Sequence, residues 1–111
     1  TYALSFEAGK PVSTNSSETM ADGLAVRIPD AAALATILEG VARIVAVSED
    51  EIKAAIRHYY TDTHNLVEGA GAATLAALLK ERDAMAGKKV GVIVSGGNID
   101  TAVYRDILAG G

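Results

Sequence analysis

The sequence predicts an α/β fold, in which a small parallel sheet is flanked by helices as part of a three-layer sandwich. Residues 90–94 are apolar or glycine at every position, which is typical of a strand covered on both faces. Residues 48–59 repeat apolar side chains at helical spacing, and residues 66–79 form a second stretch with helical character. The order strand, helix, possible strand, helix, strand, helix favours parallel connections.

The first element that the sequence predicts is a short helix over residues 2–8. Gly9 and Pro11 follow it, and both residue types end helices. Residues 12–18 are polar and rich in serine and threonine, which predicts a loop.

A turn, an extended piece, a helix and a strand are expected next. Asp22-Gly23 has turn chemistry, and residues 24–28 precede a proline and are expected to be extended. Asp30 can cap a helix that runs through Leu38 and ends at Gly40. Residues 43–47 are rich in β-branched side chains and predict a strand.

A capping box marks the start of the next helix. Ser48 is expected to accept from the amide of Glu51, while the Glu51 side chain reaches back, and Val47 with Ile52 forms a hydrophobic staple. Asp50 and Glu51 favour a helix N-terminus, which gives their acidity a structural and not a catalytic role. The buried face of this helix is predicted to consist of Ile52, Ala55, Ile56 and Tyr59.

A polar break over residues 61–65 precedes a helix that begins with small residues. Gly69 and Gly71 resemble the start of a dinucleotide fingerprint, but Thr74 takes the place of the third glycine and no acidic ribose partner follows at a strand end. We therefore reject a dinucleotide site. Small residues at this end of a helix allow close packing on a sheet or a cofactor. Residues 80–87 close the helix.

The strand predicted over residues 90–94, which Lys88 and Lys89 precede, ends abruptly in Ser95-Gly96-Gly97-Asn98. The carboxyl ends of such strands are where α/β proteins place ligands, and glycines allow close backbone approach. Asn98 or Asp100 is expected to cap a final helix that ends at Leu108. Ser95 is thus a small hydroxyl at the rim of an expected pocket, and a tight turn without a ligand is the alternative.

Composition excludes several classes of function. The 111 residues are 50% hydrophobic, enough for one modest core, and carry a net charge of −4 without a basic stripe. Only 5% are aromatic, so nucleic acid is not an expected partner. There is no cysteine, no stretch long enough to span a membrane and no signal-peptide pattern, which suits a cytoplasmic protein that does not bind membranes.

Few side chains are candidates for chemistry. Glu68 lies between an apolar stretch and a glycine-rich helix start, where it could line a pocket or satisfy helix amides. His58 and His64 are expected to be solvated, and no metal-ligand spacing exists. No lysine is expected to lie in the apolar surroundings that suit Schiff-base chemistry.

Four motifs follow one another along the chain. They are Thr19-Met20-Ala21-Asp22-Gly23-Leu24-Ala25-Val26, Val47-Ser48-Glu49-Asp50-Glu51-Ile52, Val67-Glu68-Gly69-Ala70-Gly71-Ala72 and Val94-Ser95-Gly96-Gly97-Asn98-Ile99-Asp100. In order and spacing they resemble the threonine dehydratase and serine racemase family of pyridoxal-phosphate enzymes, which have a tryptophan-synthase-β-like fold. The chain resembles the C-terminal part of such an enzyme, so residues 1–111 are expected to be one portion of its large domain.

The resemblance implies roles for four residues around pyridoxal phosphate. Ser95 matches the serine that bonds the pyridine nitrogen, and Gly96 follows it in the same motif. Gly23 matches a glycine near the cofactor and Glu68 a glutamate near the ring edge. The family's Schiff-base lysine, substrate loop, phosphate loop and cation site match nothing in this chain. No catalytic or metal-binding residue is therefore expected in this segment, and the isolated chain should be inactive.

The implied parent enzyme deaminates a β-hydroxy amino acid, threonine or serine, to a 2-oxo acid. Its expected partners are that amino acid, the upstream part of the same polypeptide and further copies in a homo-oligomer. Two alternatives stay open. One is a serine racemase or another lyase of this fold, and the other is an α/β binding module without catalysis.

Overall fold

The computed structural model describes all residues from Thr1 to Gly111, and it contains helices but no strand. None of the helices combines the length and the apolar character that crossing a membrane requires. The chain divides into two compact units: residues 1–19 with 24–46, and residues 20–23 with 47–111. The elements are α1 (Tyr2–Ala8), the 3₁₀ turn η1 (Asp22–Leu24), α2 (Ala31–Gly40), α3 (Glu49–Thr63), α4 (Gly69–Lys80), α5 (Arg82–Met85) and α6 (Thr101–Leu108).

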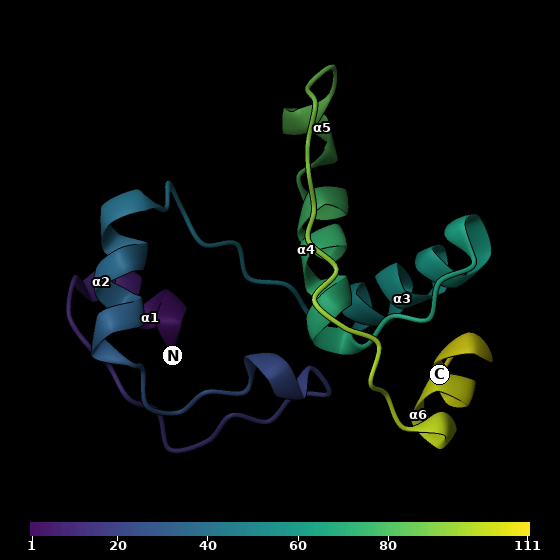
Figure 1. Ribbon diagram of the computed structural model, residues 1–111, viewed down its shortest axis with the longest axis horizontal. Coiled ribbons are helices and arrows are strands. Elements are labelled where there is room, and N and C mark those ends of the chain that lie inside the picture. Colours follow the sequence, from purple (N-terminus) through teal and green to yellow (C-terminus); the bar gives the residue numbers. More distant parts are fainter. The chain divides into compact units, whose positions relative to one another are not determined.

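The first unit contains α1 and α2, which contact each other (Figure 1). Gly9 ends α1 in the left-handed conformation with φ 69°, as the sequence predicts. The buried Ser5 hydroxyl accepts from the amide of Val12 at 2.9 Å, so the returning loop is fastened to the helix. Asp30 caps α2 by accepting from the amide of Ala33 at 2.8 Å, which confirms the predicted cap.

In the second unit, α3 begins at half of the predicted capping box. The Ser48 hydroxyl accepts from the amide of Glu51 at 3.1 Å, as expected. The return bond from Glu51 is absent, and that part of the prediction was wrong. Glu51 Oε1 instead lies 3.4 Å from Nζ of Lys80 on α4, and its other carboxylate oxygen is buried without a partner. A cation from the neighbouring helix has therefore drawn this carboxylate away from the backbone.

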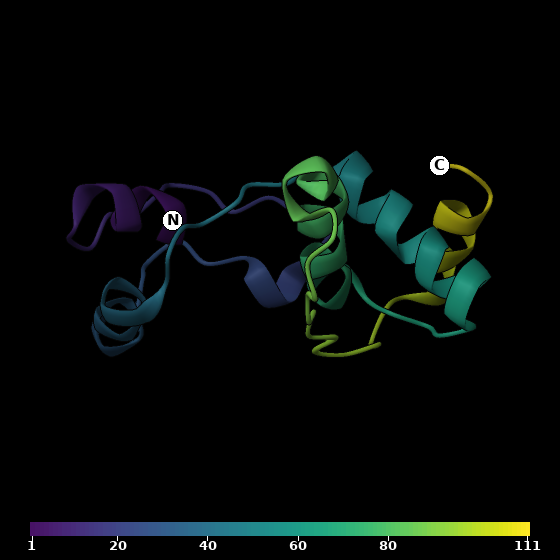
Figure 2. The same cartoon turned by 90° about the horizontal axis from the view of Figure 1, so that it is seen from above.

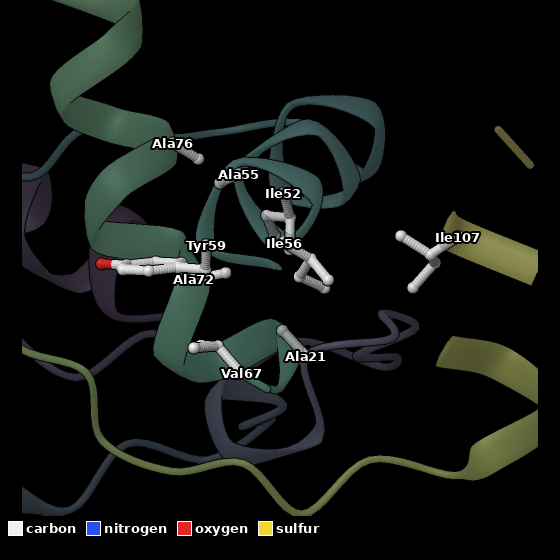
Figure 3. Packing of buried hydrophobic residues seen from close by; sticks show 9 residues of the cluster. All are labelled: Ala21, Ile52, Ala55, Ile56, Tyr59, Val67, Ala72, Ala76 and Ile107. Carbon is white, nitrogen blue, oxygen red and sulfur yellow. The ribbon is translucent and has the colours of Figure 1, made fainter. Parts of the chain in front are cut away.

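The core of the second unit lies where α3 packs against α4 and α6. All four residues of the predicted buried face of α3 are buried. Figure 3 shows the side chain of Ile107 directed from α6 toward Ile56, while Ala72 and Ala76 allow α4 to come close. The buried cluster comprises Ala21, Ile52, Ala55, Ile56, Tyr59, Val67, Ala72, Ala76 and Ile107.

Helix α3 extends further than the sequence predicts. It ends at Thr63, inside the expected polar break, and the Thr63 hydroxyl donates to the Tyr59 carbonyl at 2.7 Å. His64 then caps the helix in the left-handed conformation with φ 56°, and its amide donates to the carbonyls of the last turn. This conformation is uncommon for a residue with a Cβ atom.

Residues 88–100 run back beside α4 and lead into α6 (Figures 1 and 2). The Thr74 hydroxyl of α4 donates to the carbonyl of Ile93 at 2.9 Å. Asp100 caps α6 by accepting from Ala102 at 2.8 Å and from Val103 at 3.3 Å, which confirms one of the two predicted caps. The Thr74 side chain thus holds the middle of this segment, and the start of α6 holds its C-terminal end.

The predicted parallel sheet is absent from the structure. Residues 25–28, 43–47 and 88–94 are neither helix nor strand, and Leu24 ends η1. A strand exists only where a neighbour accepts and donates its backbone hydrogen bonds, and these three segments form no ladder with one another. Several of their apolar side chains are exposed, among them Ile28 at 74% and Ile93 at 76%. The expectation of a small sheet flanked by helices is corrected to a helical chain in which these three segments form no strand.

Candidate functional site

The loop that follows the last apolar segment presses directly on the start of α4. The amide of Glu68 donates to the carbonyl of Gly96 at 3.1 Å. A Cβ atom at Gly71 would lie 2.7 Å from the Gly96 carbonyl oxygen, and one at Gly97 would lie 2.6 Å from the carbonyl oxygen of Leu66. Any side chain at these two glycines would collide with backbone atoms, so the loop and α4 can approach this closely only through glycine.

Glu68 precedes α4, but its side chain does not cap the helix. Of the two roles that the sequence left open, satisfying helix amides is therefore excluded. Its Oε1 atom lies where a Cβ atom on Gly96 would be only 2.5 Å away. The half-buried carboxylate thus lies over the bare backbone of Gly96.

Ser95 is exposed and directly precedes Gly96. Because Gly96 is hydrogen bonded to Glu68 and the preceding Ile93 is hydrogen bonded to Thr74, the backbone is held on both sides of Ser95. The hydroxyl therefore stands at the surface of the unit, on a piece of backbone that is held on both sides.

Gly23 also comes close to the start of α4. A Cβ atom there would lie 2.9 Å from the Cβ atom of Ala70. The structure thus brings Gly96 into contact with Glu68, and Gly23 into contact with the first turn of the same helix. Their roles toward a cofactor stay predictions.

A cavity of 190 Å³ opens beside these residues within the second unit. Three carboxylates and the starts of α4 and α6 surround it, and Glu68 is the predicted site residue among its walls. The lining residues are Met20, Asp22, Glu68, Gly69, Ala70, Asn98, Ile99, Asp100 and Val103. No set of three or more histidine, cysteine, aspartate or glutamate side chains is arranged to hold a metal ion.

One contact at this site could not be predicted from the sequence. The carboxylate of Glu49, at the start of α3, accepts from the backbone amide of Met20 at 3.0 Å. No local pattern signals a bond between residues so far apart in the chain, and the capping box accounts for the acidic residues around Glu49 without it.

Two tyrosines of the second unit have displaced pKa values. Burial raises the pKa of Tyr59, whose hydroxyl has no hydrogen-bond partner. Burial and the neighbouring Tyr60 raise the pKa of Tyr104, and the rings of Tyr60 and Tyr104 meet edge to face at 6.3 Å. Neither tyrosine lines the cavity beside Glu68.

The pyridoxal-phosphate dependent enzyme family has a sequence model that matches residues 1–96. The chain belongs to this family. The resemblance expected from the four motifs is thereby confirmed, and the expected cofactor is the one on which the family depends.

Two curated proteins illustrate the similarity of this chain to its relatives. It is 40% identical to the L-threonine ammonia-lyase of Geobacter sulfurreducens, over 96% of this chain and 28% of that protein. It is 37% identical to the serine racemase of Dictyostelium discoideum, over 90% of this chain and 29% of that protein. The chain thus spans less than a third of the curated relatives it matches.

A solved structure of the same kind shares the fold of the chain. The processed form of threonine deaminase isoform 2 from Solanum lycopersicum superposes with a TM-score of 0.87 at 28% identity, over 97% of this chain and 32% of that one. The arrangement of this segment of a pyridoxal-phosphate dependent enzyme is therefore retained here.

Proposed function

We propose that the full-length protein is a pyridoxal-phosphate dependent ammonia-lyase that deaminates a β-hydroxy amino acid, threonine or serine, to a 2-oxo acid. The main support is the contact between Glu68 and Gly96, which places a carboxylate over bare backbone at the residue that follows Ser95. The names of the relatives agree with this chemistry.

The residues present fit the ring end of the cofactor. A flat ring needs a surface without side chains, and Gly96 provides one. Two polar residues adjoin Gly96: the exposed Ser95 precedes it in the chain, and Glu68 has a carboxylate that does not cap α4. In this proposal Ser95 holds the pyridine nitrogen, Glu68 lies at the ring edge, and Gly96 and Gly23 leave room for the ring. When bound, pyridoxal phosphate supplies an electron sink for bond breaking at the α-carbon of the amino acid.

The neutral hydroxyl of Ser95 suits β-elimination. A hydroxyl can bond the ring nitrogen without protonating it, whereas an aspartate in the same place would favour the protonated ring. The electron sink is weaker with Ser95, and it suffices for elimination because the leaving hydroxyl group carries negative charge away. The lysine that holds the cofactor and the phosphate-binding loop are assigned to parts of the protein outside residues 1–111.

We further propose that residues 43–47 and 88–94 are strands of a parallel sheet in the full-length protein. Neither segment forms a strand here, and residues 88–94 expose apolar side chains at successive positions. Strands from the rest of the protein would supply the missing hydrogen bonds and cover these side chains.

Serine racemization is the second candidate, and the identity to a serine racemase favours it. The two reactions are separated by supplying the purified full-length protein with L-threonine and with L-serine. Release of 2-oxo acid, followed through NADH oxidation in a coupled dehydrogenase assay, supports the lyase. Formation of D-serine on a chiral column without 2-oxo acid supports the racemase. A protein that binds no pyridoxal phosphate and forms neither product would contradict both.

A further inference from the structure

We propose that Glu49 is a positioning residue that fixes the Met20–Gly23 turn against the cofactor site. This inference rests on the proposed function, because it assigns Glu49 a task at the proposed cofactor site. Glu49 does not itself line the cavity. The bond that carries it runs from the amide of Met20 to Oε2 of Glu49, 3.0 Å apart.

The turn is clamped between two helices. Glu49, on the first turn of α3, bonds it at Met20. Ala21 is 1% exposed and lies against α4, since a Cβ atom on Gly69 would be 3.1 Å from the Ala21 Cα atom. Gly23 follows, and it packs on Ala70. The turn therefore has little freedom to shift while the Glu49 bond is intact.

Glu68 and Gly96, two further proposed cofactor residues, also adjoin the start of α4. Glu68 directly precedes Gly69, and its amide bonds the Gly96 carbonyl. Met20 and Glu68 both line the 190 Å³ cavity. The Glu49 bond thus sets how far the wall formed by the turn stands from the wall formed by Glu68.

A carboxylate is suited to this task. A backbone amide binds a charged acceptor more strongly than a neutral one, and the acidic group also favours the start of α3. Asp50, the adjacent acid in the same helix turn, is exposed and provides a matched control. Replacing either acid removes the same charge from the helix start, but only Glu49 bonds the turn.

The test compares Glu49→Ala, Glu49→Gln and Asp50→Ala in the full-length protein. Two quantities are measured: hydrogen exchange of the peptide that contains Met20–Gly23, and affinity for pyridoxal phosphate by fluorescence titration of the cofactor-free protein. We expect Glu49→Ala to speed exchange in the turn and to weaken cofactor binding about tenfold, since small misplacements of a site carry large costs. Glu49→Gln retains an acceptor oxygen and should stay within about twofold of wild type.

Two results would overturn the inference. One is equal behaviour of Glu49→Ala and Asp50→Ala, which would reduce the effect to helix electrostatics. The other is a Glu49→Ala protein whose melting temperature falls while exchange in the turn and cofactor affinity stay at wild-type values. A wild-type protein that binds no pyridoxal phosphate would instead refute the proposed function, and the exchange measurement would still decide whether Glu49 fixes the turn.

Discussion

The amide of Glu68 donates to the carbonyl of Gly96, and no side chain stands between the two backbones. This bond joins the first residues of α4 to the loop after the last apolar segment. Because Gly71 lies directly beneath the same carbonyl, the contact depends on a glycine in the helix as well as on one in the loop.

Replacing Gly71 with alanine should separate the loop from α4. The new Cβ atom would lie 2.7 Å from the Gly96 carbonyl and 3.0 Å from Cγ1 of Val67, which is closer than packed atoms allow. We expect the free energy of unfolding to fall by about 1–3 kcal/mol in urea denaturation, although alanine favours helices. Gly40→Ala is the control, since nothing lies within 4 Å of the added atom. Equal free energies of unfolding for the two variants would mean that the loop shifts to accommodate the added Cβ atom at little cost.

Ser95→Ala should impair catalysis without affecting folding. The side chain is exposed, so we expect the free energy of unfolding to change by less than about 0.5 kcal/mol. Loss of one hydrogen bond to the cofactor ring should lower kcat/KM of the full-length enzyme by roughly tenfold or more. Steady-state kinetics and thermal melts of the same preparations provide the measurement. Wild-type kinetics in Ser95→Ala would remove Ser95 from the cofactor site.

Tyr59→Phe should be neutral or stabilising. The Tyr59 hydroxyl is buried without a partner, and removing an unsatisfied polar group relieves its desolvation cost. We expect the free energy of unfolding to stay the same or to rise by up to about 1 kcal/mol. Tyr60→Phe, which removes an exposed hydroxyl, is the control. A clear loss of stability in Tyr59→Phe would reveal a hydrogen-bond partner supplied by the rest of the protein.

The same side chain should limit stability at alkaline pH. Burial raises the pKa of Tyr59 in the folded state, while in the unfolded chain it titrates near its usual value of about 10. Above that pH the unfolded state loses its proton first, so the contribution of Tyr59 to stability is complete below pH 10 and is lost as the pH rises through the folded pKa. Between pH 8 and about 11, the free energy of unfolding obtained from denaturation curves should therefore fall less steeply for Tyr59→Phe than for wild type. Parallel slopes would show that Tyr59 titrates alike in both states.

Arg57→Ala should loosen α6 from α3. The Arg57 guanidinium donates to the carbonyl of Ile107 at 3.1 Å, and this carbonyl also accepts from the amide of Gly110 at 3.1 Å. Hydrogen bonds to charged groups contribute about 1.5–3 kcal/mol, so a loss of that size is expected, with partial recovery in Arg57→Lys. Arg105→Ala, an exposed change on α6, should cost less than about 0.5 kcal/mol. Similar losses in the two alanine variants would contradict a specific role for the Arg57 bond.

Residues 1–111 produced alone should associate and bind a hydrophobic dye. The exposed side chains of Val90, Val92, Ile93 and Val94 form an unpaired apolar segment that invites pairing with another chain. Light scattering and dye fluorescence are the measurements, and Ile93→Lys should reduce both signals. A monomeric protein that does not increase the fluorescence of the dye would show that these side chains are covered within the chain.

Local signals predicted the helices well. Asp30, Ser48 and Asp100 each cap a helix within a few residues of their own position, so a short window of sequence contains everything that the cap requires. The helical spacing of the apolar residues of α3 likewise indicates a face that the neighbouring helices cover. Interactions between residues that are close together in the sequence could therefore be predicted.

Contacts between distant segments escaped prediction. Residues 90–94 have the composition of a strand, but composition cannot supply the neighbour whose backbone a strand needs. Glu51 turned to Lys80, and Glu49 bonded Met20, because tertiary packing brought those partners within reach. At the site, the motifs predicted that Glu68 and Gly96 matter, while their direct contact emerged only from the structure.

The α3–α4 pair also has a consequence for the order of folding. The two helices are joined by residues 64–68 alone, so their contact closes a short loop at a small entropic cost. The loop at Gly96 must instead return from beyond α5, and the partner of Glu49 comes from far upstream. Low contact order thus favours α3 and α4 as an early platform, onto which both walls of the cavity dock afterwards.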